Sequence, residues 1–189
     1  MKRQGIKYFT SELKGILIKT LKLRRDAVRS YALYDLMLNT GLRLAEVMGL
    51  DVGDVENRTV LEVIGKGSKF REIPLNKAIR EHIQDFLSWK KKKGEGLSAD
   101  SPLFVSRLGK RLSKRAVQRD LAKWVKQAGI EGHFTPHSLR HTVGTELLNK
   151  TGNLRVVQEF LGHADISTTQ IYTHVSREQI QQAADLLAI

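Results

Sequence analysis

The chain has 189 residues, of which 32 are Lys or Arg and 20 are Asp or Glu, so its formal net charge at pH 7 is +12. The 41% hydrophobic and 28% charged fractions are typical of a globular protein rather than a disordered one. The absence of Cys excludes disulfides, cysteine nucleophiles and thiolate metal sites. No apolar run reaches the roughly 20 residues that cross a bilayer, and the N-terminus lacks the apolar core of a signal peptide. We therefore expect a cytoplasmic protein whose partner is polyanionic, either nucleic acid or an anionic membrane surface.

The first part of the chain is predicted to fold as helices followed by a hairpin. Thr10 is a candidate N-cap for a first helix, and a second helix is expected from about Asp26 until Gly41. A short helix is expected over residues 43–48. Residues 59–74 contain two β-rich runs, TVLEVI and FREIP, joined by GKGSK, which predicts an antiparallel hairpin with a basic tip.

The rest of the chain has mainly helical periodicity. Residues 90–102 have no apolar period and begin with four consecutive lysines, so we expect a surface loop or hinge there. The further helices are predicted from Asn76, from about Ser113 to Gly129, over 136–150 behind Thr135, over 154–161, and from Ser176. The predicted fold class is therefore mainly α with a small antiparallel β-sheet (α+β), in a single domain over residues 1–189.

Residues with catalytic chemistry gather towards the C-terminus. His137 and Arg140 in PHSLRHT are three residues apart, so a helix projects both from one face. Tyr172 lies in the mostly polar segment LGHADISTTQIYTHV, nine residues after His163. Taken singly, each has an ordinary structural explanation: a helix cap for His137, a surface ion pair for Arg140 and a loop position for His163.

A metal site is the first alternative for these histidines. His137 and His141 have the i, i+4 spacing of the zinc motif H-E-x-x-H. Ser138 stands at the Glu position, there is no Cys, and Arg140 between the two histidines would repel a cation. The G-x-S-x-G, Walker A and GxGxxG motifs are absent as well. We therefore expect no metal and no nucleotide cofactor.

Four segments together resemble the successive boxes of the tyrosine recombinase catalytic domain, the family of phage integrases and Xer-like enzymes. They are TGLRLAEVMGL at 40–50, VIGKGSKFREIPL at 63–75, TPHSLRHT at 135–142 and LGHADISTTQIYTHV at 161–175. The resemblance implies the tyrosine recombinase catalytic-domain fold and six catalytic residues: Arg43, Lys66, His137, Arg140, His163 and Tyr172. Among the supporting residues, Glu46 resembles the acidic residue that orients the first arginine, Lys69 is a rival to Lys66 for the hairpin role, and His141 follows Arg140.

The same resemblance implies site-specific recombination of double-stranded DNA, of the integration or excision type, with no cofactor and no membrane partner. Tyr172 would attack a phosphodiester to give a 3′-phosphotyrosyl intermediate, in a homotetramer assembled on DNA from chains that are monomers when free. The N-terminal core-binding domain of full-length members is expected to be absent from this chain. The alternatives are a type IB topoisomerase-like relaxing enzyme and a DNA-binding module without catalysis. Basic residues expected to contact phosphates include Lys110, Arg111, Lys114, Arg115 and Arg119.

Overall fold

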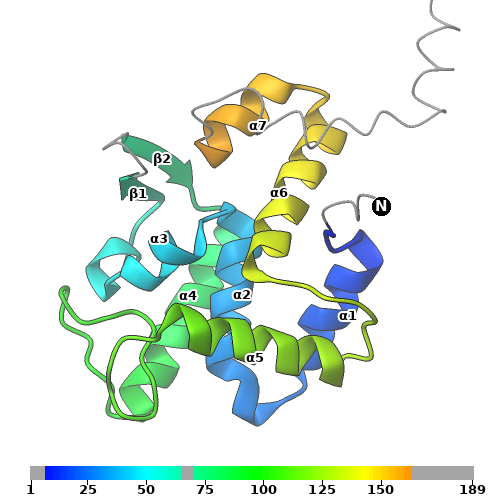
Figure 1. Cartoon of the computed structure of the whole chain (residues 1–189). Helices are drawn as coiled ribbons and strands as arrows, with labels where there is room; N and C mark the ends of the chain where they lie inside the picture. Colours follow the sequence, from blue (N-terminus) through cyan, green and yellow to red (C-terminus); the bar gives the residue numbers. More distant parts are fainter. Residues whose placement is uncertain (1–6, 65–69, 163–189) are drawn as a thin grey trace, which may run out of the picture.

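The structure, a computed structural model, describes residues 7–64 and 70–162, which form a mainly helical fold with one hairpin (Figure 1). Two 3₁₀ turns, Arg25–Ala27 and Val52–Asp54, and two strands, β1 (Val60–Ile64) and β2 (Phe70–Pro74), accompany the α-helices. The helices are α1 (Ser11–Lys22), α2 (Val28–Thr40), α3 (Leu44–Gly49), α4 (Lys77–Lys92), α5 (Lys114–Gln127), α6 (Pro136–Thr151) and α7 (Leu154–Leu161). The predicted class, mainly α with a small antiparallel sheet, is confirmed.

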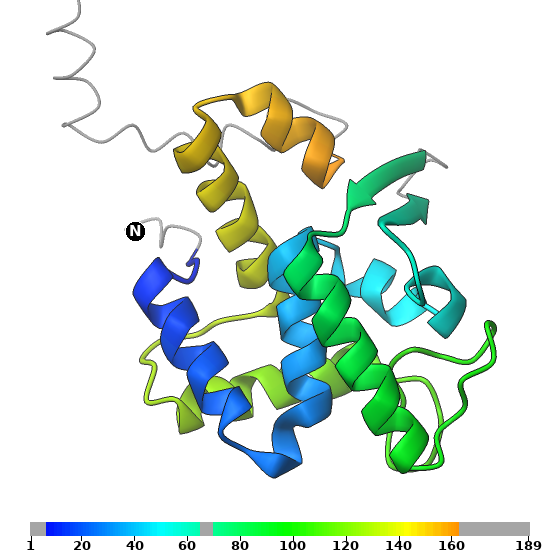
Figure 2. The same cartoon turned by 180° about the vertical axis from the view of Figure 1, so that it is seen from behind.

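Helix α2 is the central element of the fold. Most of its side chains are buried, because α1, α4 and α6 all pack against it. Figure 2 shows α4 lying along α2, and Figure 1 shows α6 on another side. A helix that is covered on several sides carries apolar residues around most of its circumference. The C-terminal end of α2 is consequently enclosed by other elements, and the candidate site forms there.

The helix starts follow from local capping. Thr10, Asn76 and Ser113 each accept a hydrogen bond from the backbone N–H three residues on, as the sequence predicts for N-caps. Pro136 opens α6 behind Thr135, whose backbone N–H donates to Ser138 Oγ at 3.2 Å. These starts are therefore set by residues within one turn of each helix. The helix predicted from Ser176 lies outside the described residues.

The hairpin has the predicted antiparallel pairing. Val60 lies opposite Pro74, and Ile64 lies opposite Phe70. The side chains alternate along the strands, as a sheet with one covered face requires, and the inward positions include Leu61, Val63 and Ile73. Residues 65–69, which hold the predicted basic tip, lie outside the described residues.

The loop predicted over residues 90–102 starts too early. Helix α4 continues to Lys92, and Lys90 is 0% exposed. The Lys90 ammonium group donates to Glu95 Oε2 at 3.2 Å and to the Pro102 carbonyl at 3.3 Å. An apolar-periodicity argument misplaces such a residue, because it treats a run of lysines as solvated and cannot foresee a buried, paired charge.

The segment PLFV at residues 102–105 is a short β-like run in the sequence. It forms isolated bridges, Asp51 with Pro102 and Val105 with Arg111, rather than a strand of the sheet. Among the described helices, none combines the length and apolar composition needed to cross a membrane.

Candidate active site

The site is built where α2 ends against α6 and α7. Gly41 follows α2 with a φ of +62°, the left-handed region that glycine adopts without strain. A Cβ at this position would lie 2.5 Å from Leu161 Cδ2 and 3.2 Å from Val143 Cγ1. A larger residue would therefore be strained at this φ and would require the Leu161 and Val143 side chains to shift.

Arg140 ties these helix ends together from α6. Its Nη1 donates to the Gly41 carbonyl and its Nη2 to the Leu161 carbonyl, both at 2.6 Å. The side chain is buried. Carbonyls at helix C-termini carry partial negative charge, so a guanidinium group is well placed between the ends of α2 and α7. Arg140 is thus a buried arginine that bonds to two backbone carbonyls.

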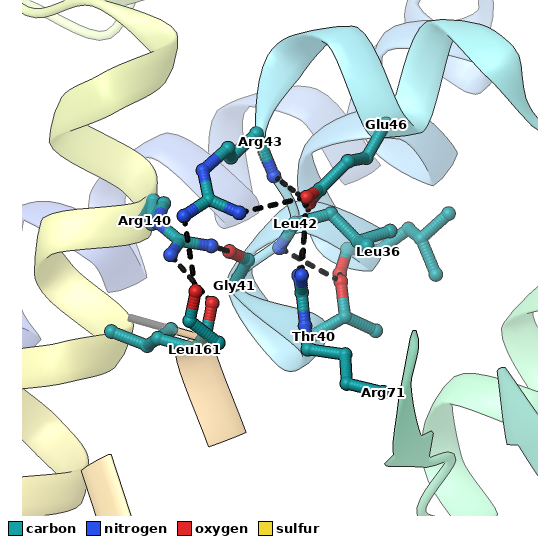
Figure 3. A network of polar contacts seen from close by, with 10 residues as sticks. Leu36, Thr40, Gly41, Leu42, Arg43, Glu46, Arg71, Arg140 and Leu161 are labelled. Carbon is teal, nitrogen blue, oxygen red and sulfur yellow. Dashed lines mark hydrogen bonds and ion pairs between the residues drawn. The ribbon is translucent and has the colours of Figure 1, made fainter. Parts of the chain in front are cut away.

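Arg43 brings a second guanidinium group to the same place. It is the N-cap residue of α3, and its Nη2 donates to the Gly162 carbonyl at 3.2 Å. Arg43 and Arg140 therefore bond to neighbouring carbonyls at the end of α7 (Figure 3). The Arg43 side chain is 38% exposed, so part of it remains accessible to a ligand.

Glu46 orients Arg43, as the sequence predicts. Its Oε2 accepts from the Arg43 backbone N–H at 2.7 Å, and its Oε1 accepts from Arg43 Nη1 at 2.9 Å. The Glu46 side chain is only 8% exposed. Burial by itself would raise the pKa of this carboxyl, but hydrogen bonds from Arg71 and from the Arg43 backbone hold the pKa below its usual value. The carboxylate is therefore ionised at neutral pH.

Arg71 on β2 is the residue that sequence reasoning missed at this site. It makes two hydrogen bonds to Glu46, from Nη1 to Oε1 at 3.1 Å and from Nη2 to Oε2 at 2.9 Å (Figure 3). The only local signal is the alternation in FREIP, which puts Arg71 on the same strand face as the buried Ile73. A charged residue on a covered strand face needs a partner, and here the partner is 25 residues earlier in the chain.

His137 lies in the first turn of α6, one turn before Arg140, and keeps an exposed edge. Partial burial, followed by the positive charges of Arg140 and Arg43, lowers the pKa of His137 below 6.5. The ring is therefore neutral at pH 7 and has a nitrogen that is able to accept a proton. The structure brings together three of the six predicted catalytic residues, Arg43, His137 and Arg140.

His141 lies one turn further along α6 in a different environment. It is buried, and its ring packs edge-on against Tyr8, with the ring centroids 5.6 Å apart. In residues 7–64 and 70–162 no three His, Cys, Asp or Glu side chains gather as a candidate metal site. The supporting role of His141 stays a prediction.

Four of the predicted residues lie outside the described part of the chain. They are Lys66, Lys69, His163 and Tyr172. Sequence adjacency alone relates one of them to the observed geometry, because His163 directly follows Gly162. Their roles stay predictions.

Arg111 has a different role from the expected phosphate contact. Its Nη1 donates to the Met48 carbonyl at 3.0 Å and to the Leu50 carbonyl at 2.8 Å, and its Nη2 lies 2.5 Å from Asp51 Oδ1. It therefore fixes the C-terminal end of α3, the helix that carries Glu46. The other basic residues expected to contact phosphates, Lys110, Lys114, Arg115 and Arg119, are exposed.

Comparison with known proteins agrees with this geometry. Residues 9–179 match the phage integrase family, and the chain therefore belongs to that family. It is 45% identical over 161 residues to tyrosine recombinase XerC of Vibrio campbellii, a match that covers 84% of this chain and 50% of the relative. The chain thus spans about half the length of the curated relatives it matches.

Solved structures show the same fold. A crystal structure of XerA recombinase superposes with a TM-score of 0.81 at 27% identity, covering 97% of this chain and 65% of that one. XerH site-specific recombinase, solved in a pre-cleavage complex with its difH substrate, has a TM-score of 0.80 at 23% identity, covering 100% of this chain and 56% of that one. The predicted tyrosine recombinase catalytic-domain fold is confirmed.

Proposed function

We propose that the protein breaks and rejoins strands of double-stranded DNA in site-specific recombination, through a 3′-phosphotyrosyl intermediate. The observation that carries this proposal is the convergence of Arg43 and Arg140 on the end of α7, with His137 one turn before Arg140 on α6. Similarity to XerC recombinases over most of the chain supports it. The XerH structure, which contains a DNA substrate, supports DNA as the partner.

The two arginines would stabilise the transition state of strand cleavage. When an oxygen nucleophile attacks a phosphodiester, charge builds up on the two non-bridging oxygens. Planar guanidinium groups bind such oxygens through paired hydrogen bonds, and they act best when their positions are fixed beforehand. Backbone carbonyls and Glu46 fix Arg140 and Arg43 in this way. We assign a further hydrogen bond to these oxygens to His163.

The proton transfers complete the proposed reaction. A tyrosine hydroxyl has a reference pKa of about 10, so Tyr172 must lose its proton as it attacks, and His137 is the candidate base. The phosphotyrosyl bond forms as the bond to the 5′-oxygen breaks, and Lys66 protonates that departing oxygen. Rejoining is the reverse reaction with a 5′-hydroxyl, so the bond energy is retained and no nucleotide is consumed. We further propose a homotetramer on DNA, built from chains that are monomers when free.

Covalent capture tests the proposal. A library of nicked duplexes with randomised sequence around the nick traps any tyrosyl adduct, because the short cleaved fragment diffuses away. We expect the native chain to form an adduct that survives denaturing electrophoresis, is insensitive to EDTA and is lost in Tyr172→Phe. Tyr8→Phe is the matched control, since it also removes one tyrosine hydroxyl and keeps the ring that packs against His141. An adduct that persists in Tyr172→Phe, or one that EDTA abolishes, would contradict the proposal.

The selected sequence then separates recombination from relaxation. On a supercoiled plasmid that carries two copies of this sequence, recombination exchanges the segments between them. Relaxed plasmid without exchanged products would instead indicate a topoisomerase-like enzyme.

A sulfur-substituted duplex identifies the general acid. Loss of a general acid typically slows a reaction by about 10²- to 10⁴-fold, and we expect this slowing in Lys66→Ala. A bridging 5′-sulfur leaves as a thiolate, whose conjugate acid has a pKa of about 8.5, so it needs no proton. The sulfur substrate should restore cleavage to Lys66→Ala but not to Arg43→Ala. If the sulfur substrate instead restored cleavage to Lys69→Ala, Lys69 would be the general acid.

A further inference from the structure

Arg71 lies on the inward face of β2, where inward and outward side chains alternate along the strand. It lies opposite Val63 in the hairpin register, on the same face as Leu61 and Ile73. It is also the first inward-facing residue of β2 after the segment 65–69, which contains Lys66.

The guanidinium group of Arg71 is joined to Arg43 through a shared carboxylate. Its two parallel hydrogen bonds to Glu46, 3.1 and 2.9 Å long, fix the plane of that carboxylate. The same two oxygens accept from the backbone N–H and the Nη1 of Arg43. Glu46 is buried, so water cannot easily replace the hydrogen bonds that fix its carboxylate or solvate its charge.

Arg71 also packs directly on the end of α7. A Cβ on Gly162 would lie 2.7 Å from Arg71 Cδ and 3.2 Å from its Nε, and Gly162 has a φ of +63°. The Gly162 carbonyl is the acceptor for Arg43 Nη2. Among the described residues, Arg71 Nε is buried without a hydrogen-bond partner.

We propose that Arg71 is a positioning residue of the cleavage site, which holds the hairpin, Arg43 and the end of α7 as one unit. It acts through Glu46 on the Arg43 guanidinium group, which donates to the Gly162 carbonyl at the end of α7. This role rests on the proposed strand cleavage. It predicts that Arg71 contributes to the rate of cleavage only while Arg43 is present.

The test is the single-turnover rate of adduct formation, with the protein in excess over the selected nicked duplex. Substitution of a residue that orients a functional group typically costs about 10- to 100-fold in activity, and we expect a loss of this size in Arg71→Gln. Arg71→Lys should be intermediate, because an ammonium group keeps the charge but cannot make the paired bonds. Arg155→Gln is the matched control, since Arg155 is an exposed residue of α7 that pairs with Glu159.

The decisive comparison is the double variant. If Arg71 acts through Arg43, then Arg43→Ala with Arg71→Gln is no slower than Arg43→Ala alone, within about threefold. If Arg71→Gln only weakened the fold, the losses of cleavage rate in the two single variants would multiply in the double variant. Urea unfolding curves would then show a matching loss of stability. Native-like cleavage by Arg71→Gln, or multiplied losses, would overturn the inference while leaving the proposed function intact. Absence of any adduct with the native chain would reject the proposed function and this role with it.

Discussion

The two ends of α2 each lie beside a glutamate that binds two cationic side chains. At the C-terminal end, Glu46 binds Arg43 and Arg71, and at the N-terminal end, Glu95 binds Arg29 and Lys90. The difference lies in the exposure of the cations. Lys90 is fully buried and donates to the Pro102 carbonyl, whereas more than a third of the Arg43 side chain is exposed.

The same kind of ion cluster therefore serves two purposes. Around Glu95 it ties the end of α4 and the following loop to α2, and Arg29 also lies over the Trp89 ring at 5.1 Å. All its charge is used within the fold. Around Glu46, one guanidinium group completes the fold and the other is held in place with part of its surface accessible. Variants of the two clusters should consequently separate stability from catalysis.

The largest expected effect is the loss of cleavage in Arg43→Ala. Removal of one donor that stabilises a charged transition state costs about 10²- to 10³-fold in rate. Because Glu46 keeps Arg71, the free energy of unfolding should change by less than about 1 kcal/mol. Single-turnover cleavage and urea unfolding on one preparation test both parts. Arg29→Ala, the corresponding change at the other cluster, should keep the native rate, and a slow Arg29→Ala would erase the contrast between the clusters.

The second largest expected effect is a loss of folding stability in Glu95→Gln. This change leaves Lys90 buried without its carboxylate, which should lower the free energy of unfolding by about 3 kcal/mol. The cleavage rate of the folded fraction should remain native. Lys90→Met is the matched control, because it replaces the buried cation by an apolar chain while Glu95 keeps Arg29, and it should cost less than about 1.5 kcal/mol. Equal losses in both variants would contradict the account of this cluster.

A smaller effect is expected from pH on cleavage. The pKa of His137 is lowered from 6.5, so the ring is mostly neutral at pH 7 and above. Cleavage should therefore change little between about pH 8 and about pH 7 and should decline in acid with a midpoint below pH 6.5. In His137→Gln the rate should be lower overall, and this decline in acid should be absent. A midpoint above pH 6.5 would exclude His137 as the base in its observed environment.

The smallest effect is the contribution of Glu46 to stability against acid. Its folded-state pKa is below the ordinary 4.5, so its ionised form stabilises the fold fully above pH 4.5. This contribution is lost as pH falls through the lowered pKa. Urea unfolding should show native protein and Glu46→Gln differing most at neutral pH and converging in acid. A difference that grows in acid would contradict the assigned direction of the shift.

The sequence predicts the parts of this fold that depend on neighbouring residues. Thr10, Asn76 and Ser113 start their helices through hydrogen bonds within one turn, and Glu46 reaches Arg43 within three residues. Periodicity predicts the buried faces of α4 and α5, with Ile79, Ile83, Phe86, Leu87, Val117, Leu121, Trp124 and Val125.

What the sequence does not predict depends on distant partners. Lys90 is buried because Glu95 and Pro102 fold back onto α4, and Arg71 is buried because the hairpin closes over Glu46. A run of lysines does not show which groups Lys90 will pair with, and strand alternation does not show that Arg71 will pair with Glu46. The boxes of the family predict Arg43, Arg140 and His137 but carry no information on the carbonyls that hold the two arginines.

The central claim is that Arg43 stabilises charge on a non-bridging oxygen of the scissile phosphate. Cleavage of a selected duplex in which a methylphosphonate replaces that oxygen tests this most directly, because the substituted linkage carries no negative charge. The account predicts that the loss caused by Arg43→Ala shrinks from about 10²- to 10³-fold to less than about 10-fold on this substrate, while the loss caused by His137→Gln is unchanged. An Arg43→Ala variant that is equally impaired on both substrates would contradict it.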